Sequence, residues 1–268
     1  MPPPVMTPSW FAQLPVPPVR SPVRLERLAW PDAAHTLQDV LLLPVGAMEQ
    51  HGPHLPLHTD TVIAESTCQL ASALTGAPVL PALGYSVSLG HTVKWPGTFS
   101  LFHETLMLTV REIAQWAADT GWNRLLIVNS HYGNDAALRC AVDRLRHDLG
   151  GNLLTATRNT WDLTPEIAGR FTHDAADWHA NEAETSLMLF LDPAAVVKER
   201  LSTADDPDRT MGCVFPHRVA HTSLNGVTGR PSLGTVEQGA LLISRMGDAL
   251  ADLIQKARVE HPPLTWAP

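Results

Sequence analysis

The sequence VLLLPVGAMEQHGPHLPLHTD, residues 40–60, contains the segment that decides the fold. Its first six residues are almost wholly apolar, as in a strand buried on both faces of a parallel sheet. The segment that follows holds two carboxylates, Glu49 and Asp60, and three histidines within twelve residues. Imidazole nitrogens and carboxylate oxygens are ligands that Zn²⁺, Mn²⁺ and Fe²⁺ accept. This stretch therefore predicts a buried strand that ends at a metal site.

The rest of the chain alternates between short apolar runs and segments of helical periodicity. Strands are expected at residues 40–45, 78–83, 124–129 and 153–158. Helices are expected at residues 61–74, 104–120, 136–149, 184–191 and 236–259. This alternation predicts a single three-layer α/β/α domain with a mostly parallel central sheet, and 268 residues suffice to bury its core.

The N-terminal segment differs in composition from the rest of the chain. Residues 1–22 contain eight prolines, which predicts an extended N-terminal arm ahead of a domain formed by residues 23–268. Trp10, Phe11 and Leu14 could dock this arm on the domain, or the arm could be a loose tail, and the sequence leaves both open.

Composition narrows the class of function. A net charge of −8 and 17% charged residues argue against a nucleic-acid surface and favour a small-molecule substrate. The three cysteines are widely spaced and form no Cys-x-x-Cys pair, so neither a disulfide framework nor a thiolate zinc site is expected. The sequence has no secretory signal or membrane span, so a cytoplasmic location is expected.

Polar side chains follow the expected strands at three places. The first is the segment that contains Glu49, His51 and Asp60; the second is NSHYGN at 129–134; the third is DWHANEAETS at 177–186. Ligands of open α/β sheets bind beyond the carboxyl ends of the strands. We therefore expect all three segments to converge there.

These motifs resemble those of the creatininase family of metal-dependent amidohydrolases. The resemblance rests on GAMEQHG at 46–52 with Asp60, on NSHYGN and on HxxExETS at 179–186, and it extends from about residue 25 to the helix after Gly234. It implies a creatininase-like fold and hydrolysis of a C–N bond, other than a peptide bond, in a small cyclic or linear amide. It also implies a homo-oligomer, with a hexamer as the expected assembly.

The resemblance implies a dinuclear centre. Glu49, His51, Asp60 and His131 fall on the metal ligands of the family, and the two oxygens of Asp60 suit a bridge between two ions. Two divalent ions per subunit are expected, with zinc preferred and manganese or iron as alternatives. A pair of ions roughly 3.5–4 Å apart can lower the pKa of bound water from about 15.7 towards about 7, which supplies hydroxide as the nucleophile.

One position departs from creatininase itself, which has a ligating glutamate where this chain has Gly133. Other branches of the family also have glycine there, so the third motif is expected to supply the carboxylate. This reasoning predicts Glu182 as the fifth ligand, with Glu184 orienting a ligand or capping its helix and Asn134 supporting the site.

The remaining site residues concern proton transfer and the substrate. His179 is the candidate that carries a proton to the departing nitrogen, because an unperturbed histidine titrates near pH 6.5. Tyr132, Trp161 and Trp178 are expected to line the substrate pocket, with core packing as the alternative for the two tryptophans.

Two alternatives stay open. Within the family, the chain could be a formamide deformylase or a peptidase of cofactor biosynthesis. From a different class, it could be a metal-binding protein without catalysis, which a closed set of four protein ligands would favour. No role is assigned to His54, His58 or His217. His91 and Lys94 could contact a carboxylate or phosphate of the substrate or be solvated, and solvation is favoured.

Overall fold

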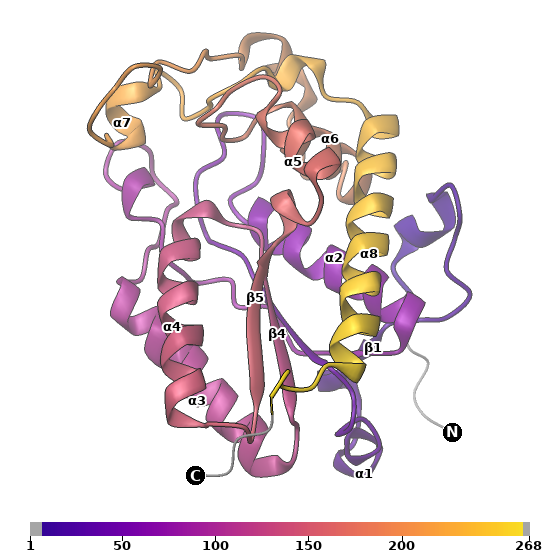
Figure 1. Ribbon diagram of the computed structural model, residues 1–268. Coiled ribbons are helices and arrows are strands. Elements are labelled where there is room, and N and C mark those ends of the chain that lie inside the picture. Colours follow the sequence, from indigo (N-terminus) through magenta and orange to yellow (C-terminus); the bar gives the residue numbers. More distant parts are fainter. Residues whose placement is uncertain (1–6, 265–268) are drawn as a thin grey trace.

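The structure of the protein is a computed structural model that describes residues 7–264, and its helices and strands alternate along most of the chain (Figure 1). The strands are β1 (Val23–Arg24), β2 (Leu41–Val45), β3 (Pro78–Val79), β4 (Arg124–Asn129) and β5 (Leu154–Asn159). The helices are α1 (Trp30–Ala34), α2 (Thr59–Thr75), α3 (His103–Thr120), α4 (Asp135–Asp148), α5 (Pro165–Thr172), α6 (Glu182–Leu191), α7 (Val219–Thr222) and α8 (Val236–Val259).

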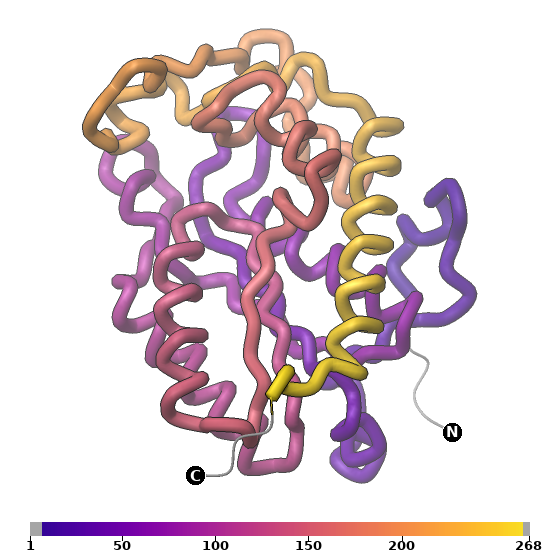
Figure 2. The backbone as a smooth tube through the Cα atoms, viewed as in Figure 1, coloured from indigo at the N-terminus to yellow at the C-terminus, as the bar shows by residue number. Residues whose placement is uncertain are grey.

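The five strands form one sheet in the order β1-β3-β2-β4-β5, and every pair is parallel. This confirms the predicted fold class. The central strands β2 and β4 pair in register from Leu41 with Leu125 to Val45 with Asn129. Their carboxyl ends therefore lie side by side, and the long segments that follow them gather at that end of the sheet, below the orange segment in Figure 2.

Helices cover both faces of the sheet. On one face, Leu41 and Ile127 pack in a buried cluster with α3 and α4. On the other face, Leu42 and Val128 pack in a second cluster with α2 and α8. Alternate residues of each central strand thus enter different layers, which is why these strands read as continuous apolar runs.

The proline-rich arm is docked on the domain over its described part. Trp10, Phe11 and Leu14 are buried in an apolar cluster that includes α6 and α8, and the Trp10 ring lies edge-on to Phe190 with centroids 6.0 Å apart. The first six residues of the arm lie outside the described residues. Within residues 7–264, none of the helices combines the length and apolar character that crossing a membrane requires.

The edge of the sheet differs from the prediction in two ways. The strand expected at 78–83 forms only over Pro78–Val79, because Pro81 has no N–H to give to the ladder. Strand β1, which pairs with β3, is only two residues long and was not predicted. Helix α5 was not predicted either, although it buries Ile167 and Phe171 at helical spacing.

Candidate metal centre

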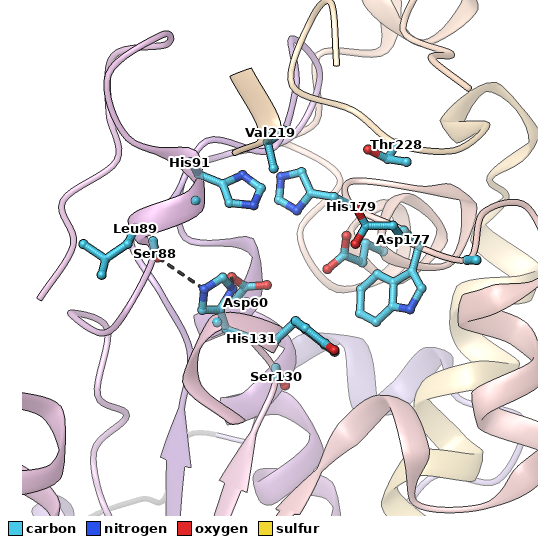
Figure 3. Close-up of a pocket in the computed structure, with 16 residues that line it drawn as sticks. Asp60, Ser88, Leu89, His91, Ser130, His131, Asp177, His179, Val219 and Thr228 are labelled. Atoms are coloured by element: carbon cyan, nitrogen blue, oxygen red, sulfur yellow. Dashed lines mark hydrogen bonds and ion pairs between the residues drawn. The ribbon is translucent and has the colours of Figure 1, made fainter. Parts of the chain in front are cut away.

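The three polar segments converge at the carboxyl ends of β2 and β4. Glu49 and His51 follow β2, Asp60 lies in the first turn of α2, His131 follows β4, and Glu184 lies in the first turn of α6. All five side chains are buried, and several of them face a common cavity (Figure 3). The fold therefore collects carboxylates and imidazoles from four separate stretches of sequence.

Glu49, Asp60 and His131 form the first group of potential metal ligands. The two nitrogens of His131 face different carboxylates: Nδ1 lies 3.0 Å from Asp60 Oδ2 and Nε2 lies 3.3 Å from Glu49 Oε2. One oxygen of each carboxylate and one nitrogen of the imidazole can thus point at a single ion.

His51, His179 and Glu184 form a second group. His51 Nε2 lies 3.2 Å from Asp60 Oδ1 and 3.8 Å from Glu184 Oε1. Asp60 therefore faces His131 with one oxygen and His51 with the other, which is the geometry that a carboxylate shared between two ions requires.

The prediction that Glu182 is a metal ligand of this centre is wrong, because its carboxylate pairs with residues outside the cluster. Glu182 Oε1 accepts a hydrogen bond from Arg170 at 2.7 Å, and its Oε2 lies 3.0 Å from His173 Nε2. Neither Glu182 nor His173 belongs to a group of potential ligands among residues 7–264. The carboxylate that reaches the cluster from the third motif is Glu184, which was expected only to support a ligand.

Gly133 leaves no room for a ligand of its own. A Cβ atom built at this position would lie 2.4 Å from the Val87 carbonyl oxygen and 2.5 Å from His131 Nε2. Any side chain here would displace His131, so a carboxylate from α6 is the one that the geometry can accommodate.

Other polar residues of the motifs brace the loops. Asn134 accepts a hydrogen bond from the Val87 amide at 2.9 Å and donates to the Gly46 carbonyl at 3.0 Å, which ties the turn after β4 to the turn after β2. His54 is buried and its Nε2 lies 2.9 Å from the Thr185 hydroxyl, whereas His58 is exposed. Neither of these histidines joins a group of potential ligands among residues 7–264.

His91 is a member of the cluster that the sequence did not identify. It follows Ser88 in a short 3-10 helix (Leu89–His91), and its Nδ1 lies 3.3 Å from Glu49 Oε1. With Glu49 and His179 it forms a third group of potential ligands. His91 lies outside the three motifs, so its position in the sequence did not indicate that it would lie close to Glu49. Only the tertiary fold brings the two residues together.

The buried oxygens fit divalent cations. Glu49 Oε1, Glu49 Oε2 and Asp60 Oδ2 accept no well-formed hydrogen bond among the described residues, and the polar atoms that face them are ring nitrogens of histidines, at 3.0–3.6 Å. Burying a neutral polar group without a hydrogen bond costs on the order of 2–7 kcal/mol, and burying an ionised carboxylate without a donor or a cation costs more. Carboxylates and imidazoles together are the donor set that Zn²⁺ and Mn²⁺ accept. The residues present therefore suit the metal ions that the sequence predicts.

The charges of the cluster are strongly coupled. Burial raises the pKa of Glu49 and of Glu184 to about 7. Burial acts against the charged form of His51 and His131 as well, but the surrounding carboxylates prevail and raise the pKa of His51 to about 10 and of His131 to about 9. Protons thus occupy this site in the absence of cations, and metal binding must release them.

His91 and His179 behave differently. Burial lowers the pKa of both imidazoles well below the usual range, and the neighbouring histidines act in the same direction. Their rings lie next to each other with centroids 4.2 Å apart. Both are therefore neutral at pH 7 and can accept or donate a hydrogen bond through a defined nitrogen.

A cavity of about 240 Å³ opens above the cluster. Tyr132 and Trp178 line it, as expected for substrate-binding residues, and Tyr132 is 72% exposed. Trp161 does not line it: its side chain is 8% exposed and packs in the core behind the other two, with ring centroids 6.0 Å from Tyr132 and 5.9 Å from Trp178. Trp161 is therefore packed in the core, which was the alternative expectation for this residue.

Comparison with known proteins gives the family of the chain. The family model described as "Creatininase: Creatinine amidohydrolase" matches residues 26–254. Creatinine amidohydrolase of Pseudomonas putida is 32% identical over 84% of this chain and 90% of its own length. Mycofactocin precursor peptide peptidase of Mycolicibacterium smegmatis is also 32% identical, over 83% of this chain and 87% of its own length.

Solved structures give the same result. A manganese creatininase structure superposes with a TM-score of 0.78 at 29% identity, over 89% of this chain and all of its own. A mutant creatininase described as "Zn-Zn type" has the same TM-score and identity, over 89% of this chain and 99% of its own. An α/β/α hydrolase with a carboxylate and histidine cluster at its strand ends is thus the class of protein that fold and site define. The chain belongs to the creatininase family.

Proposed function

We propose that this hydrolase uses two divalent metal ions to hydrolyse the C–N bond of a small amide. The observation that carries the proposal is the set of buried oxygens of Glu49 and Asp60 that accept no well-formed hydrogen bond, surrounded by His51, His131 and Glu184. When bound, such ions supply Lewis-acid polarisation of a carbonyl and a water whose pKa is lowered towards about 7. Zinc is the preferred metal, and manganese is the first alternative, since both occur in the descriptions of related creatininases.

The protein side chains then have separate tasks. Glu49, Asp60 and His131 would hold one ion. His51 and Glu184 would hold the other together with the second oxygen of Asp60, which lies 3.2 Å from His51 Nε2. His179 would move the proton: its Nε2 lies 2.8 Å from the Gln50 carbonyl oxygen and donates to it, so the lone pair of Nδ1 faces the cluster. That nitrogen can take a proton at the centre and pass it to the leaving amine.

The cavity sets the kind of substrate. Tyr132 and Trp178 offer aromatic surface at its wall, which suits a flat, polar amide. No Lys or Arg is among the residues that line the cavity in the described part of the chain, so a substrate carboxylate would have to be met by the cations. A small cyclic or linear amide is the substrate class that we propose, and assembly of the chain into a homo-oligomer stays a prediction.

Peptide hydrolysis is a second candidate. The peptidase relative is as similar in sequence as the creatinine amidohydrolase, so sequence identity does not separate the two activities. The exposed position of Tyr132 at the mouth of the cavity would allow a longer chain to enter.

A substrate panel tests the proposal. Protein freed of metal with a chelator and then reloaded with Zn²⁺ or Mn²⁺ is assayed on creatinine, on N-formyl compounds and on short peptides. We expect hydrolysis of one class to disappear on chelation and return on reloading, and His147→Ala, an exposed histidine outside the site, to be unaffected. Full activity after complete metal removal would refute metal dependence, and the class hydrolysed separates an amidohydrolase from a peptidase.

A further inference from the structure

The buried amide of Gln50 has a fixed orientation. Its Oε1 accepts a hydrogen bond from the Gly52 amide at 3.0 Å, and its Nε2 donates to the Gly226 carbonyl oxygen at 3.1 Å. A backbone N–H can only donate and a carbonyl can only accept, so these two partners decide which end of the Gln50 amide is the nitrogen. The second N–H of Gln50 Nε2 must donate to another acceptor.

His179 cannot accept this remaining N–H. Its Nε2 lies 3.2 Å from Gln50 Nε2, but the same nitrogen lies 2.8 Å from the Gln50 carbonyl oxygen. Because a carbonyl oxygen cannot donate, His179 Nε2 must carry the proton. A protonated ring nitrogen has no lone pair for a second donor.

His91 is therefore the acceptor. Its Nδ1 lies 2.9 Å from Gln50 Nε2, so in the neutral ring Nδ1 has the lone pair and Nε2 has the proton. No residue in 7–264 accepts a hydrogen bond from His91 Nε2, and His91 lines the cavity beside His179 (Figure 3). Gln50 thus gives the two adjacent histidines opposite tautomers, through its side-chain amide at His91 and its backbone carbonyl oxygen at His179.

We propose that His91 donates a hydrogen bond from Nε2 to the carbonyl oxygen of the substrate, and that Gln50 is the positioning residue that fixes its tautomer. This inference rests on the proposed function, because it adds a substrate contact to that same site. A fixed N–H donor aimed at an oxygen that gains negative charge stabilises the transition state more than the bound substrate. His91 is then the donor to the substrate and His179 the acceptor of its proton.

The loop that contains Gly226 holds this arrangement in place. Gly226 has a φ of 91°, and a Cβ atom there would lie 2.0 Å from Gln50 Oε1. Gly226→Ala must therefore displace the Gln50 amide without changing any group that faces the substrate or the metal. Gly226→Ala is therefore a second variant, besides a change of Gln50 itself, that disturbs the hydrogen bond from Gln50 to His91.

The tautomer can be measured without any substrate. Protein labelled with ¹⁵N in its histidine rings is freed of metal, and two-bond proton–nitrogen correlations identify which ring nitrogen is protonated. The His91 signals are those missing from His91→Gln. We expect Nε2–H in the wild type, Nδ1–H in Gln50→Glu, where a carboxylate accepts instead of donating, and a mixture of the two in Gly226→Ala. Wild-type protonation at Nδ1, or one tautomer in all three proteins, would overturn the inference.

Kinetics test the contact with the substrate. On the amide that the panel identifies, Zn²⁺-loaded His91→Phe should lose about 10²-fold in kcat with the same bound metal, the scale found for removal of one oxyanion donor. Gln50→Met should lower kcat in the same way, and the double variant should be little worse than either. Wild-type kcat in His91→Phe would overturn the proposal. If the wild type hydrolyses no amide, the proposed function fails, while the tautomer measurement still decides whether Gln50 positions His91.

Discussion

Glu182 and Glu184 lie two residues apart in the first turn of α6, and their carboxylates face different surroundings. Glu184 Oε1 lies 3.8 Å from His51 Nε2 in the metal cluster, whereas Glu182 pairs with Arg170 and His173 outside it. Successive residues of an α-helix are about 100° apart around its axis, so two positions that differ by two lie about 200° apart. The helix can present one of these carboxylates to the centre, and its packing presents Glu184.

This relationship makes the two glutamates a matched pair. We expect Glu184→Gln to lose one of the two ions per chain, because an amide binds a divalent cation far more weakly than a carboxylate. Glu182→Gln should keep both. Elemental analysis of the purified variants after loading with Zn²⁺ measures this directly. An unchanged metal content in Glu184→Gln, or loss in Glu182→Gln, would reverse our assignment.

His179→Ala separates proton transfer from metal binding. The ligands that we propose for the two ions, Glu49, Asp60 and His131 for one and His51, Asp60 and Glu184 for the other, do not include His179, so both ions should remain. Turnover should fall by at least about 10²-fold, the contribution expected of a general acid–base residue. If the variant loses an ion together with its activity, His179 is a ligand and the proton has another carrier.

Metal dependence of stability should grow with pH. In the metal-free protein the pKa of Glu49 rises by burial from 4.5 to about 7, and the carboxylates, acting against burial, raise that of His131 from 6.5 to about 9. Over these ranges Glu49 and His131 bind more protons in the folded state than in the unfolded state, so the stability that these two groups contribute falls as pH rises from about 4.5 to 9. Metal binding needs the deprotonated ligands and compensates for this loss.

We therefore expect the difference in Tm between Zn²⁺-loaded and metal-free protein to widen from pH 6 to pH 9, at one fixed concentration of free metal. Differential scanning calorimetry at several pH values checks it. A constant difference would mean that Glu49 and His131 do not release protons on binding the metal.

Tyr132 and Trp161 should respond in opposite ways to truncation. Trp161→Ala removes a ring from the core and should lower the free energy of unfolding by about 3–5 kcal/mol. Tyr132→Ala changes an exposed ring and should alter stability by less than about 0.5 kcal/mol, while raising KM. Urea unfolding and steady-state kinetics on both variants measure the contrast. A stable Trp161→Ala enzyme with altered KM would instead assign Trp161 to the substrate.

Much of this protein follows from local sequence. The apolar run at 124–129 coincides with β4, and the periodic segment at 236–259 coincides with α8, because a buried parallel strand and an amphipathic helix each leave a characteristic pattern. The polar residues after the first strand and at 131 also converge as expected, since the ends of neighbouring parallel strands share one edge of the sheet.

Tertiary structure decided the rest. Periodicity places Glu182 and Glu184 on a helix but does not give the rotation of that helix about its axis, which its contacts with α2 and α8 determine. Likewise, no local pattern brings His91 over Glu49 or gives Gln50 its partners at Gly226 and His91, because these contacts join segments more than 40 residues apart. The residue types and their order set the chemistry of the centre, and long-range packing chose which side chains reach it.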